Sequence, residues 1–223
     1  MGEPVDTTPA RRPVREPLVG RFVSLVPVDP DAHAAGLFAA SHDGSDESDR
    51  MWTYLAYGPW PDSGAMRAWA DTLPASEDPL FFTVVDVATH APVGVVSYLN
   101  IDRTMRHVEL GHIWFAPSAQ RSRANTEAAY LMLRASFDEW GYRRVEWKCD
   151  ALNARSRAAA ERLGFTFEGV FRQHMIIKGR NRDTAWFAML EEEWPAARTA
   201  FERWLDAPEP PPPLRELRAS VQP

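Results

Sequence analysis

The sequence predicts one α/β (α+β) domain, in which a mixed central β-sheet is flanked by helices. Three observations support this class. The chain has 223 residues, which is enough for a single domain, strand-like and helix-like patterns alternate along its middle, and no repeat or linker interrupts them. Because a domain of about 200 residues buries about 70% of the surface of its unfolded chain, it needs no disulfide or metal to be stable.

The ends of the chain differ in composition from its middle. Residues 1–17 are polar and proline-rich, and residues 206–223 carry Pro208 and Pro210 to Pro213. Such segments are typical of flexible or polyproline-type tails. We therefore expect a disordered N-terminal tail over residues 1–17, a folded domain over residues 18–205, and a Pro-rich C-terminal tail over residues 206–223.

The composition also narrows the class of protein. The single cysteine, Cys149, excludes an intramolecular disulfide and a cysteine-based zinc site, so we expect a reducing, cytoplasmic location and no metal. No stretch reaches the roughly 18 consecutive apolar residues that a membrane span needs, so we expect no membrane insertion. The net charge of −6 argues against direct nucleic-acid binding.

The charge is unevenly distributed along the chain. Residues 120–180 hold 12 Lys and Arg against 7 Asp and Glu, although the whole chain is acidic. This local excess of positive charge would suit a compact anionic ligand. A solvated surface of mixed charges would produce the same counts.

The predicted elements follow one another closely. A strand, two helices and three strands occupy the first half of the domain, and a helix, a strand, a helix, two strands and a helix occupy the second. In the first half we expect strands at 22–26, 80–87, 92–101 and 107–115, and helices at 31–40 and 63–73. In the second half we expect helices at 126–140, 154–163 and 192–205, and strands at 143–150, 165–177 and 184–190.

The two central helices have the clearest signals. In the first, apolar residues recur from Ala128 to Ala135 at i, i+3, i+4, i+7 spacing, and Gly141 is a stop signal. The second helix has Asn153 as its expected N-cap and Gly164 at its expected C-terminal end.

The segment between strand 107–115 and the next helix carries the first chemical signal. Residues 116–125 lead into a helix start, where unpaired backbone N–H groups and the positive end of the helix dipole favour an anion. Arg121 and Arg123 add two positive charges, so this loop would suit a pyrophosphate. Arginines on an ordinary surface loop are the alternative interpretation.

Nearly the whole of residues 18–205 resembles a known family. The segments that carry the resemblance are LGHIWFAPSAQRSRANTEAAYLMLRASFDEWGYRRVEWKCDALNARSRAAAERLGFTFEG and KGRNRDTAWFAMLEEEWP. They are similar to the GNAT superfamily of N-acetyltransferases, in particular its RimJ/RimL-like branch. The resemblance implies the GNAT acyl-CoA N-acyltransferase fold, acetyl-CoA as co-substrate, and direct transfer of an acetyl group to a primary amine in a ternary complex.

The family's motifs imply which residues contact the cofactor. Its CoA loop reads Gln or Arg, two residues, Gly, one residue, then Gly or Ala; Gln120 matches the first position, whereas Arg123 and Asn125 replace the small residues. We therefore expect arginine side chains to clamp the pyrophosphate, with loss of CoA binding as the competing outcome. The expected cofactor-binding residues are Ile113, Trp114, Phe115, Gln120, Arg121, Ser122, Arg123, Ala124, Asn125, Thr126, Asn153 and Ser156.

The motif from Asn153 to Ser156 also implies a catalytic role. In the RimL-like branch its Asn touches the pantetheine arm, and its Ser lies near the CoA sulfur, where it can protonate the departing thiolate. Ala160 stands where other branches have a tyrosine, so a tyrosine general acid at that position is excluded. An ordinary helix cap beside a small buried residue is the alternative.

Transfer to an amine also needs a group that takes the ammonium proton. Glu109 is our leading candidate, because it lies where histone-acetylating members of the superfamily carry a glutamate base. Simple alternation would place Glu109, Gly111, Ile113 and Phe115 on one face of the strand. A structural glutamate that faces solvent is the alternative.

Three reserve bases stay open. They are His112, His174 and Asp150. The RimL-like branch often has a carboxylate on its sixth strand, but the equivalent position here is Met175, beside His174. A lone histidine on a strand more often has a structural role.

The acceptor side of the site is less defined. The aromatic segment 51–60 could hold a cationic amine or simply pack onto the sheet. Acceptors in similar proteins include protein N-termini and small amines, and fold does not choose among them. A catalytically degenerate domain that binds CoA or a protein is the alternative function, and a homodimer stays open.

Overall fold

The structure is a computed structural model, and it describes residues 2–221. Its eight strands form one sheet in the order β1-β2-β3-β4-β5-β6-β8-β7. The strands are β1 (Leu18–Val19), β2 (Val23–Pro27), β3 (Leu80–Asp86), β4 (Pro92–Asp102), β5 (His107–Phe115), β6 (Arg144–Asp150), β7 (Thr166–Ile177) and β8 (Arg180–Leu190). The α-helices are α1 (Pro30–Ser41), α2 (Asp46–Met51), α3 (Ser63–Ala70), α4 (Arg123–Arg134), α5 (Ala154–Leu163), α6 (Trp194–Asp206) and α7 (Leu214–Ala219). A 3-10 helix (Pro117–Ala119) precedes α4, and a π-helical turn (Ala135–Glu139) continues it.

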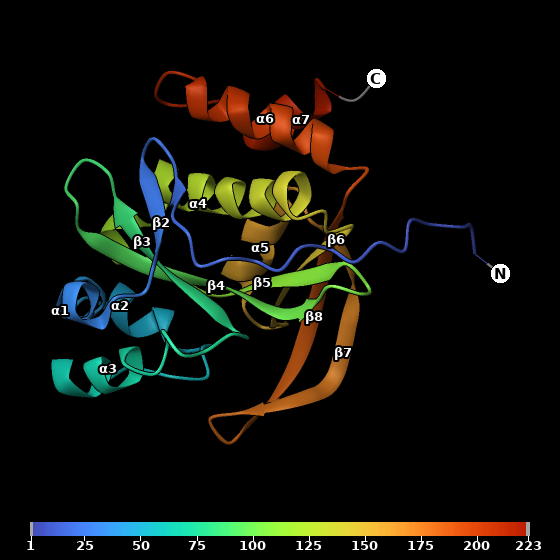
Figure 1. Cartoon of the computed structure of the whole chain (residues 1–223). Coiled ribbons are helices and arrows are strands. Elements are labelled where there is room, and N and C mark those ends of the chain that lie inside the picture. The colour runs from blue at the N-terminus through green and yellow to red at the C-terminus, as the bar shows by residue number, and fades with distance from the viewer. Residues whose placement is uncertain (1, 222–223) are drawn as a thin grey trace.

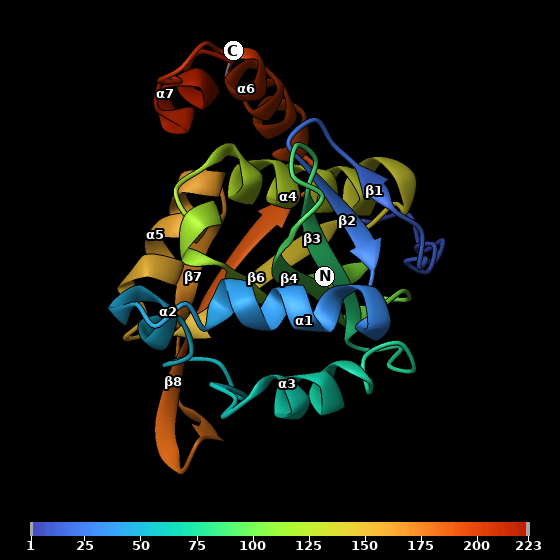
Figure 2. The ribbon, with the colours of Figure 1, turned by 90° about the vertical axis from the view of Figure 1, so that its left-hand side faces the viewer.

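Helices cover the two faces of this sheet unequally. Figures 1 and 2 show α4 and α5 on one face, with α6 and α7 stacked beyond α4, and α1 and α3 on the opposite side. The long hairpin of β7 and β8 extends past the sheet toward the side of α3 (Figure 1). This arrangement is the mixed sheet flanked by helices that the sequence predicts.

Two clusters of buried side chains match these two faces. The larger cluster joins the sheet to α4, α5 and α6 and includes Leu131, Leu163 and Phe201. The smaller cluster lies under α1 and α3, with Leu37 and Trp52 at its centre. The helices are therefore held by burial of their apolar sides, which is the main source of helix stability in proteins.

The pair β5–β6 decides where a site can form. It is the single parallel pair of the sheet within residues 2–221, and its register runs only from His107–Arg144 to Leu110–Trp147. Beyond Leu110, β5 continues beside β4 alone. We call residues 107–110 the paired half of β5 and residues 111–115 its open half.

A bulge lies within the open half, between Gly111 and Trp114. His112 has a φ of 51°, and the register of β4 against β5 shifts between Val95 and Ser97. Val108 and Phe115 consequently lie in the larger cluster, whereas Trp114 lies in the smaller one. The prediction of unbroken alternation from Glu109 to Phe115 is wrong, because the extra residue of a bulge reverses the faces that follow it.

Some boundaries differ from the sequence prediction. Helix α4 begins at Arg123 instead of Thr126, because the Ser122 hydroxyl accepts a hydrogen bond from the Ala124 N–H at 3.2 Å and so caps the helix earlier. The helix α2 was not predicted. Strand β8 begins at Arg180 instead of residue 184, so the turn of the β7–β8 hairpin is shorter than the gap between the two predicted strands.

The end segments contain more structure than flexible tails would. Helix α7 lies in the Pro-rich segment, and its Leu214 is buried in the larger cluster. Near the N-terminus, the backbone N–H groups of Ala10 and Arg11 donate to carbonyls of Arg103 and Trp140 at 2.9 and 2.8 Å. The limits 18 and 205 of the folded unit stay a prediction.

Candidate functional site

Glu109 lies at the end of the paired half of β5, and its side chain is only 8% exposed. Its Oε2 accepts a hydrogen bond from Asn100 Nδ2 at 2.6 Å and forms an ion pair with Lys148 Nζ at 3.0 Å. The other oxygen, Oε1, forms no hydrogen bond within residues 2–221. A β-carbon placed on Gly111 would lie 3.7 Å from this Oε1, so the free oxygen faces the first residue of the open half.

The electrostatic surroundings of Glu109 favour a base. Burial raises the pKa of Glu109, and Lys148 and Asn100 partly oppose this effect. In the neighbouring Glu146, burial also acts to raise the pKa, but hydrogen bonds from Lys148 and Arg144 outweigh it and leave the pKa below its usual value. Glu109 is therefore the more basic member of this pair of carboxylates.

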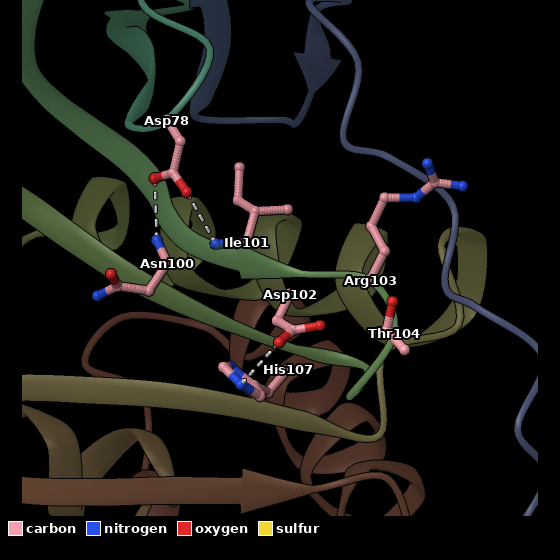
Figure 3. Close-up of a pocket in the computed structure, with 7 residues that line it drawn as sticks. All are labelled: Asp78, Asn100, Ile101, Asp102, Arg103, Thr104 and His107. Atoms are coloured by element: carbon pink, nitrogen blue, oxygen red, sulfur yellow. Dashed lines mark hydrogen bonds and ion pairs between the residues drawn. The ribbon is translucent and has the colours of Figure 1, made fainter.

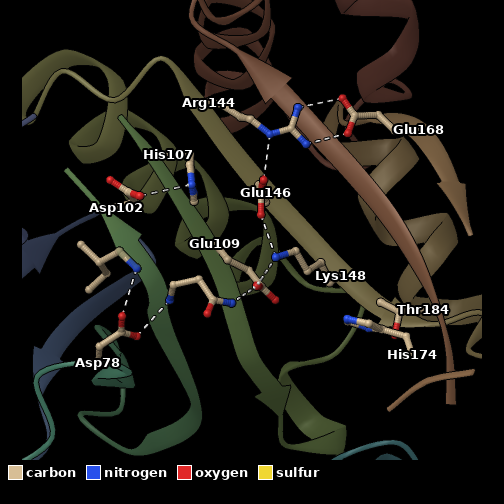
Figure 4. Close-up of polar contacts among 12 residues, drawn as sticks. Asp78, Asp102, His107, Glu109, Arg144, Glu146, Lys148, Glu168, His174 and Thr184 are labelled. Carbon is tan, nitrogen blue, oxygen red and sulfur yellow. Dashed lines mark hydrogen bonds and ion pairs between the residues drawn. The ribbon is translucent and has the colours of Figure 1, made fainter. Parts of the chain in front are cut away.

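A continuous chain of polar contacts crosses the sheet here (Figure 4). Lys148 pairs with Glu146 at 2.8 Å, Glu146 pairs with Arg144 at 2.8 Å, and Arg144 holds Glu168 of β7 at 2.6 Å. The Lys148 ammonium also lies 3.8 Å from the ring centroid of Trp186. The sequence prediction missed Lys148 and Trp186, because the contacts of Lys148 with Glu109 and with Trp186 join strands that are distant in sequence.

The corner between β5 and α4 presents the N-terminus of a helix, as the sequence predicts. Arg121 has a φ of 57°, its side chain is exposed, and it forms no hydrogen bond or ion pair within the described part of the chain. Ser122 is the N-cap of α4, and the backbone N–H groups of an N-cap and first turn lack partners within the helix, so this helix start suits an anion.

The Arg123 side chain makes structural contacts that the sequence did not predict. Its guanidinium donates to the carbonyls of Leu205 and Ala207 at 2.6 and 2.5 Å and to Glu209 at 2.5 Å. These contacts cap the C-terminal end of α6, where carbonyl groups lack helical partners. The guanidinium is therefore bonded to protein groups in this structure, which makes Arg121 the better placed of the two arginines to clamp a pyrophosphate. Cofactor binding by Arg123 stays a prediction, and its backbone N–H lies at the helix start.

The other predicted residues of this corner have structural contacts of their own. Gln120 Nε2 donates to the carbonyl of Phe115 at 3.0 Å, which ties the corner to the end of β5. Ala124 and Thr126 are buried, and Asn125 is half-buried. Thr126 Oγ1 accepts from Arg162 of α5 at 3.1 Å, so a further cation, missed by the sequence prediction, lies beside the first turn of α4.

The second predicted motif lies at the start of α5. Asn153 Oδ1 accepts from the Ser156 N–H at 3.1 Å, as expected of an N-cap. Ser156 Oγ accepts from Trp147 Nε1 at 2.9 Å. Because this contact uses an acceptor position of the hydroxyl, its proton remains available for donation.

The open half of β5 supplies the remaining predicted residues. Ile113 is half-buried, and Trp114 and Phe115 are buried on opposite faces of the sheet. Their side chains thus have packing roles. Any contact that they make to a ligand would come from the backbone edge that faces away from β4.

The reserve bases are less suited to proton transfer. His112 stacks on Tyr57 with ring centroids 5.5 Å apart, and burial lowers its pKa to about 4. Asp150 caps the following turn through the Leu152 N–H at 2.8 Å. His174 is exposed, and its Nδ1 lies 2.9 Å from Thr184 Oγ1.

The aromatic segment 51–60 packs under the open half of β5. Trp52 is 1% exposed, and its ring centroid lies 5.2 Å from that of Trp114 and 4.9 Å from that of Trp60. Lys178, at the tip of the β7–β8 hairpin, donates to the carbonyls of Trp52 and Gly58 at 2.9 and 2.6 Å. Trp52 therefore has a packing role, and hydrogen bonds from Lys178 join the hairpin tip to this segment.

Two surface pockets lie outside the predicted set of residues. One of about 570 Å³ is lined by Asp78, Asn100, Ile101, Asp102, Arg103, Thr104 and His107. Figure 3 shows Asp78 accepting hydrogen bonds from the backbone at Asn100 and Ile101, while Asp102 points to His107. The other, of about 630 Å³, is lined by residues of the β7–β8 hairpin, including Arg172 and Asp183.

Residues 2–221 also bear on metal binding and membrane insertion. No three His, Cys, Asp or Glu side chains gather closely enough there to hold a metal ion. No helix in the same range has the length and apolar composition that crossing a bilayer requires.

Comparison with known proteins identifies a family and individual proteins that are similar to this chain. Residues 23–166 match the acetyltransferase (GNAT) domain. YdaF of Bacillus subtilis strain 168, whose name provisionally describes a ribosomal N-acetyltransferase, is 31% identical over 101 residues, which are 45% of this chain and 55% of that protein. The matched region thus spans about half the length of that relative.

Solved structures of other proteins match a larger part of this chain. A GCN5-related N-acetyltransferase from Brucella melitensis is 42% identical, with a TM-score of 0.91 over 95% of this chain and 98% of the other. The microcin C7 self-immunity acetyltransferase MccE, solved with acetyl-CoA and AMP, shares the fold at 20% identity, with a TM-score of 0.64 over 77% of this chain and 93% of the other. The predicted GNAT fold is confirmed, and the name of YdaF agrees with the RimJ/RimL-like branch.

Proposed function

The chain belongs to the acetyltransferase (GNAT) family, and on that premise we propose that it transfers an acetyl group from acetyl-CoA to a primary amine. The acceptor is a small molecule or a protein N-terminus, and the transfer is direct, within a ternary complex. One observation carries the proposal: the free Oε1 of Glu109 lies beside Gly111, where β5 and β6 part.

The parted strands suit an extended ligand. The edge of β5 at residues 111–115 that faces away from β4 has no partner strand within the described residues, so the amide groups of a pantetheine arm can pair with it as a short strand would. The start of α4, with Arg121 and the adjacent N–H groups, receives the pyrophosphate. Both parts of acetyl-CoA are then held by β5 and the corner that follows it.

The chemistry proceeds by direct attack on the thioester. Glu109, directly or through a water, takes a proton from the acceptor ammonium, and the freed nitrogen attacks the carbonyl carbon. The C–S bond of the tetrahedral intermediate breaks, and the Ser156 hydroxyl passes its proton to the departing thiolate. The second proton of the nitrogen passes through solvent to the Ser156 oxygen and restores its hydroxyl. The hydrogen bond from Trp147 to Ser156 Oγ orients this hydroxyl.

A catalytically degenerate domain is the second candidate. It is favoured by the side chain of Arg123, which contacts α6 and leaves one predicted guanidinium, that of Arg121, at the corner. This candidate predicts binding of CoA or a protein without turnover.

One assay separates the two candidates. The full chain is incubated with acetyl-CoA and pooled primary amines, and free CoA is detected with a thiol-trapping reagent. Release of CoA that depends on an amine is the expected result. Calorimetric binding of acetyl-CoA without any such release would favour the binding domain and contradict the enzyme.

A further inference from the structure

Lys148 lies in the candidate site, but the proposed reaction assigns it no role. Its ammonium lies 3.0 Å from Glu109 Oε2, 2.8 Å from Glu146 Oε2 and 3.8 Å from the ring centroid of Trp186. The side chain is only 11% exposed. Since two carboxylates and an aromatic face surround the ammonium, its position is fixed from three sides.

The two carboxylates that share this ammonium are not equivalent. Glu146 has a second cation, because Arg144 Nε lies 2.8 Å from its Oε1. Glu109 has only the neutral amide of Asn100 as its other partner. Within residues 2–221, Lys148 is the one cation in an ion pair with Glu109, so its loss would leave a buried carboxylate without a counter-charge.

The same contacts determine which oxygen of Glu109 is free. Lys148 and Asn100 both bind Oε2, and this leaves Oε1 on the side of Gly111. Removal of Lys148 would therefore change both the charge and the orientation of the carboxylate.

We propose that Lys148 is a positioning residue that keeps Glu109 ionised with Oε1 free toward the open half of β5, while Glu146 weakens this effect by sharing the ammonium. The inference rests on the proposed function, in which Glu109 is the base. Lys148 acts through Glu109 and touches neither substrate.

Apart from Lys148 and Glu146, the groups around Glu109 are neutral or are paired with residues other than Glu109. On β4, Asn100 is neutral and is itself held by Asp78 through its backbone N–H. At the start of β5, His107 lies 3.9 Å from Asp102. On β7 and β8, His174 contacts Thr184, and Trp186 carries no charge. Lys148 and Glu146 are the charged groups that act directly on the titration of Glu109.

The test is a titration of the Glu109 carboxyl in the full chain, labelled with ¹³C at glutamate side-chain carboxyl groups. The signal that Glu109→Gln removes is assigned to Glu109. In Lys148→Met the titration midpoint is expected to rise by about one pH unit or more, because an opposite charge at this distance lowers a carboxyl pKa by roughly 1 to 3 units. In Glu146→Gln it is expected to fall, because the ammonium then serves Glu109 alone.

Glu168→Gln is the matched control. It removes a carboxylate from the same polar chain but contacts only Arg144, so the Glu109 midpoint should stay unchanged. Shifts of opposite sign in the first two variants support the proposal. Unchanged midpoints, or shifts of the same sign, would overturn it. If Lys148→Met does not fold, Glu146→Gln decides alone, and a midpoint that does not fall contradicts the proposal.

Activity separates this inference from the proposed function. Where the wild type transfers acetyl groups, the acidic limb of its pH–rate profile should move with the carboxyl titration, upward in Lys148→Met and downward in Glu146→Gln. Absence of turnover in the wild type would overturn the proposed function. The effect of Lys148 on Glu109 would then be tested by the carboxyl titration alone. Acetyl-CoA affinity, measured by calorimetry, should stay unchanged in all three variants.

Discussion

The paired and open halves of β5 are adjacent in sequence but differ in what surrounds them. In residues 107–110, β5 pairs with both neighbouring strands, and Glu109 joins a chain of buried charges. In residues 111–115 it pairs with β4 alone. The comparison teaches that one strand can fix a charged group and expose a binding edge within a few residues, because its pairing with β6 ends at Leu110.

The largest effect is expected at the end of the paired half. Glu109→Gln is nearly isosteric but cannot accept a proton, so it should lower kcat/KM by about 10² to 10⁴-fold. Acetyl-CoA affinity should stay the same, because the open half is untouched. Steady-state kinetics and calorimetry check the two parts. Full activity in this variant, with loss of turnover in folded His174→Ala or His112→Ala, would show that the base lies elsewhere.

The next effect contrasts two arginines of the corner that follows the open half. Arg121→Ala should weaken acetyl-CoA binding by about 1.5 to 3 kcal/mol, which is roughly 10- to 150-fold, because it removes a charge-assisted contact to phosphate. Arg123→Ala should leave this affinity nearly unchanged and instead lower the free energy of unfolding by about 1 to 3 kcal/mol, through loss of its contacts with α6. Calorimetry and urea unfolding of both variants test the contrast, and a reversed pattern would contradict the placement of Arg123.

A smaller effect is expected at the start of α5. Ser156→Ala should lower kcat by about 2- to 10-fold, the value of a typical hydrogen bond, and leave acetyl-CoA affinity intact, because the contact strengthens as charge develops on sulfur. Single-turnover kinetics measure this step. Trp147→Phe is the matched control for orientation of the hydroxyl and should produce part of the same loss. Identical kinetics for wild type and Ser156→Ala would remove the serine from the mechanism.

The last prediction concerns the bulge itself and is measured as stability instead of activity. Because burial lowers the pKa of His112 to about 4, the unfolded chain, with a histidine pKa near 6.5, binds a proton more readily than the folded chain between these values. The contribution of His112 to stability should therefore be lost progressively as pH falls from about 6.5 to about 4. His112→Asn, which tolerates positive φ, should flatten this part of the stability curve. Urea unfolding across this pH range measures it, and equal slopes in both proteins would contradict a neutral, buried imidazole.

The sequence was sufficient for features that depend on local signals. Asn153 caps α5 and Gly164 ends it with a φ of 104°, as predicted. These positions follow from side-chain hydrogen bonding and from the conformational freedom of glycine, which neighbouring residues do not override. The GNAT family and fold could be predicted from the same segments because the motifs lie within them.

The missed features depend on contacts between distant parts of the chain. Arg123 bends toward carbonyls of residues 204–207, about 80 positions later, and no local pattern indicates this. His112 is a non-glycine residue with positive φ, so its bulge interrupted an alternation that the sequence alone would continue. Lys148 could have been suspected from its two-residue spacing from Glu146, but its contact with Glu109 required the register of β5 against β6.

The structure of the complex with acetyl-CoA tests the central claim most directly. The account predicts a pantetheine arm along residues 111–115, a pyrophosphate at the backbone N–H groups that begin α4, and a thioester carbonyl on the Gly111 side of Glu109, with its sulfur near Ser156. An acetyl-CoA molecule that avoids the open half of β5, or a thioester separated from Glu109 by protein atoms, would contradict it.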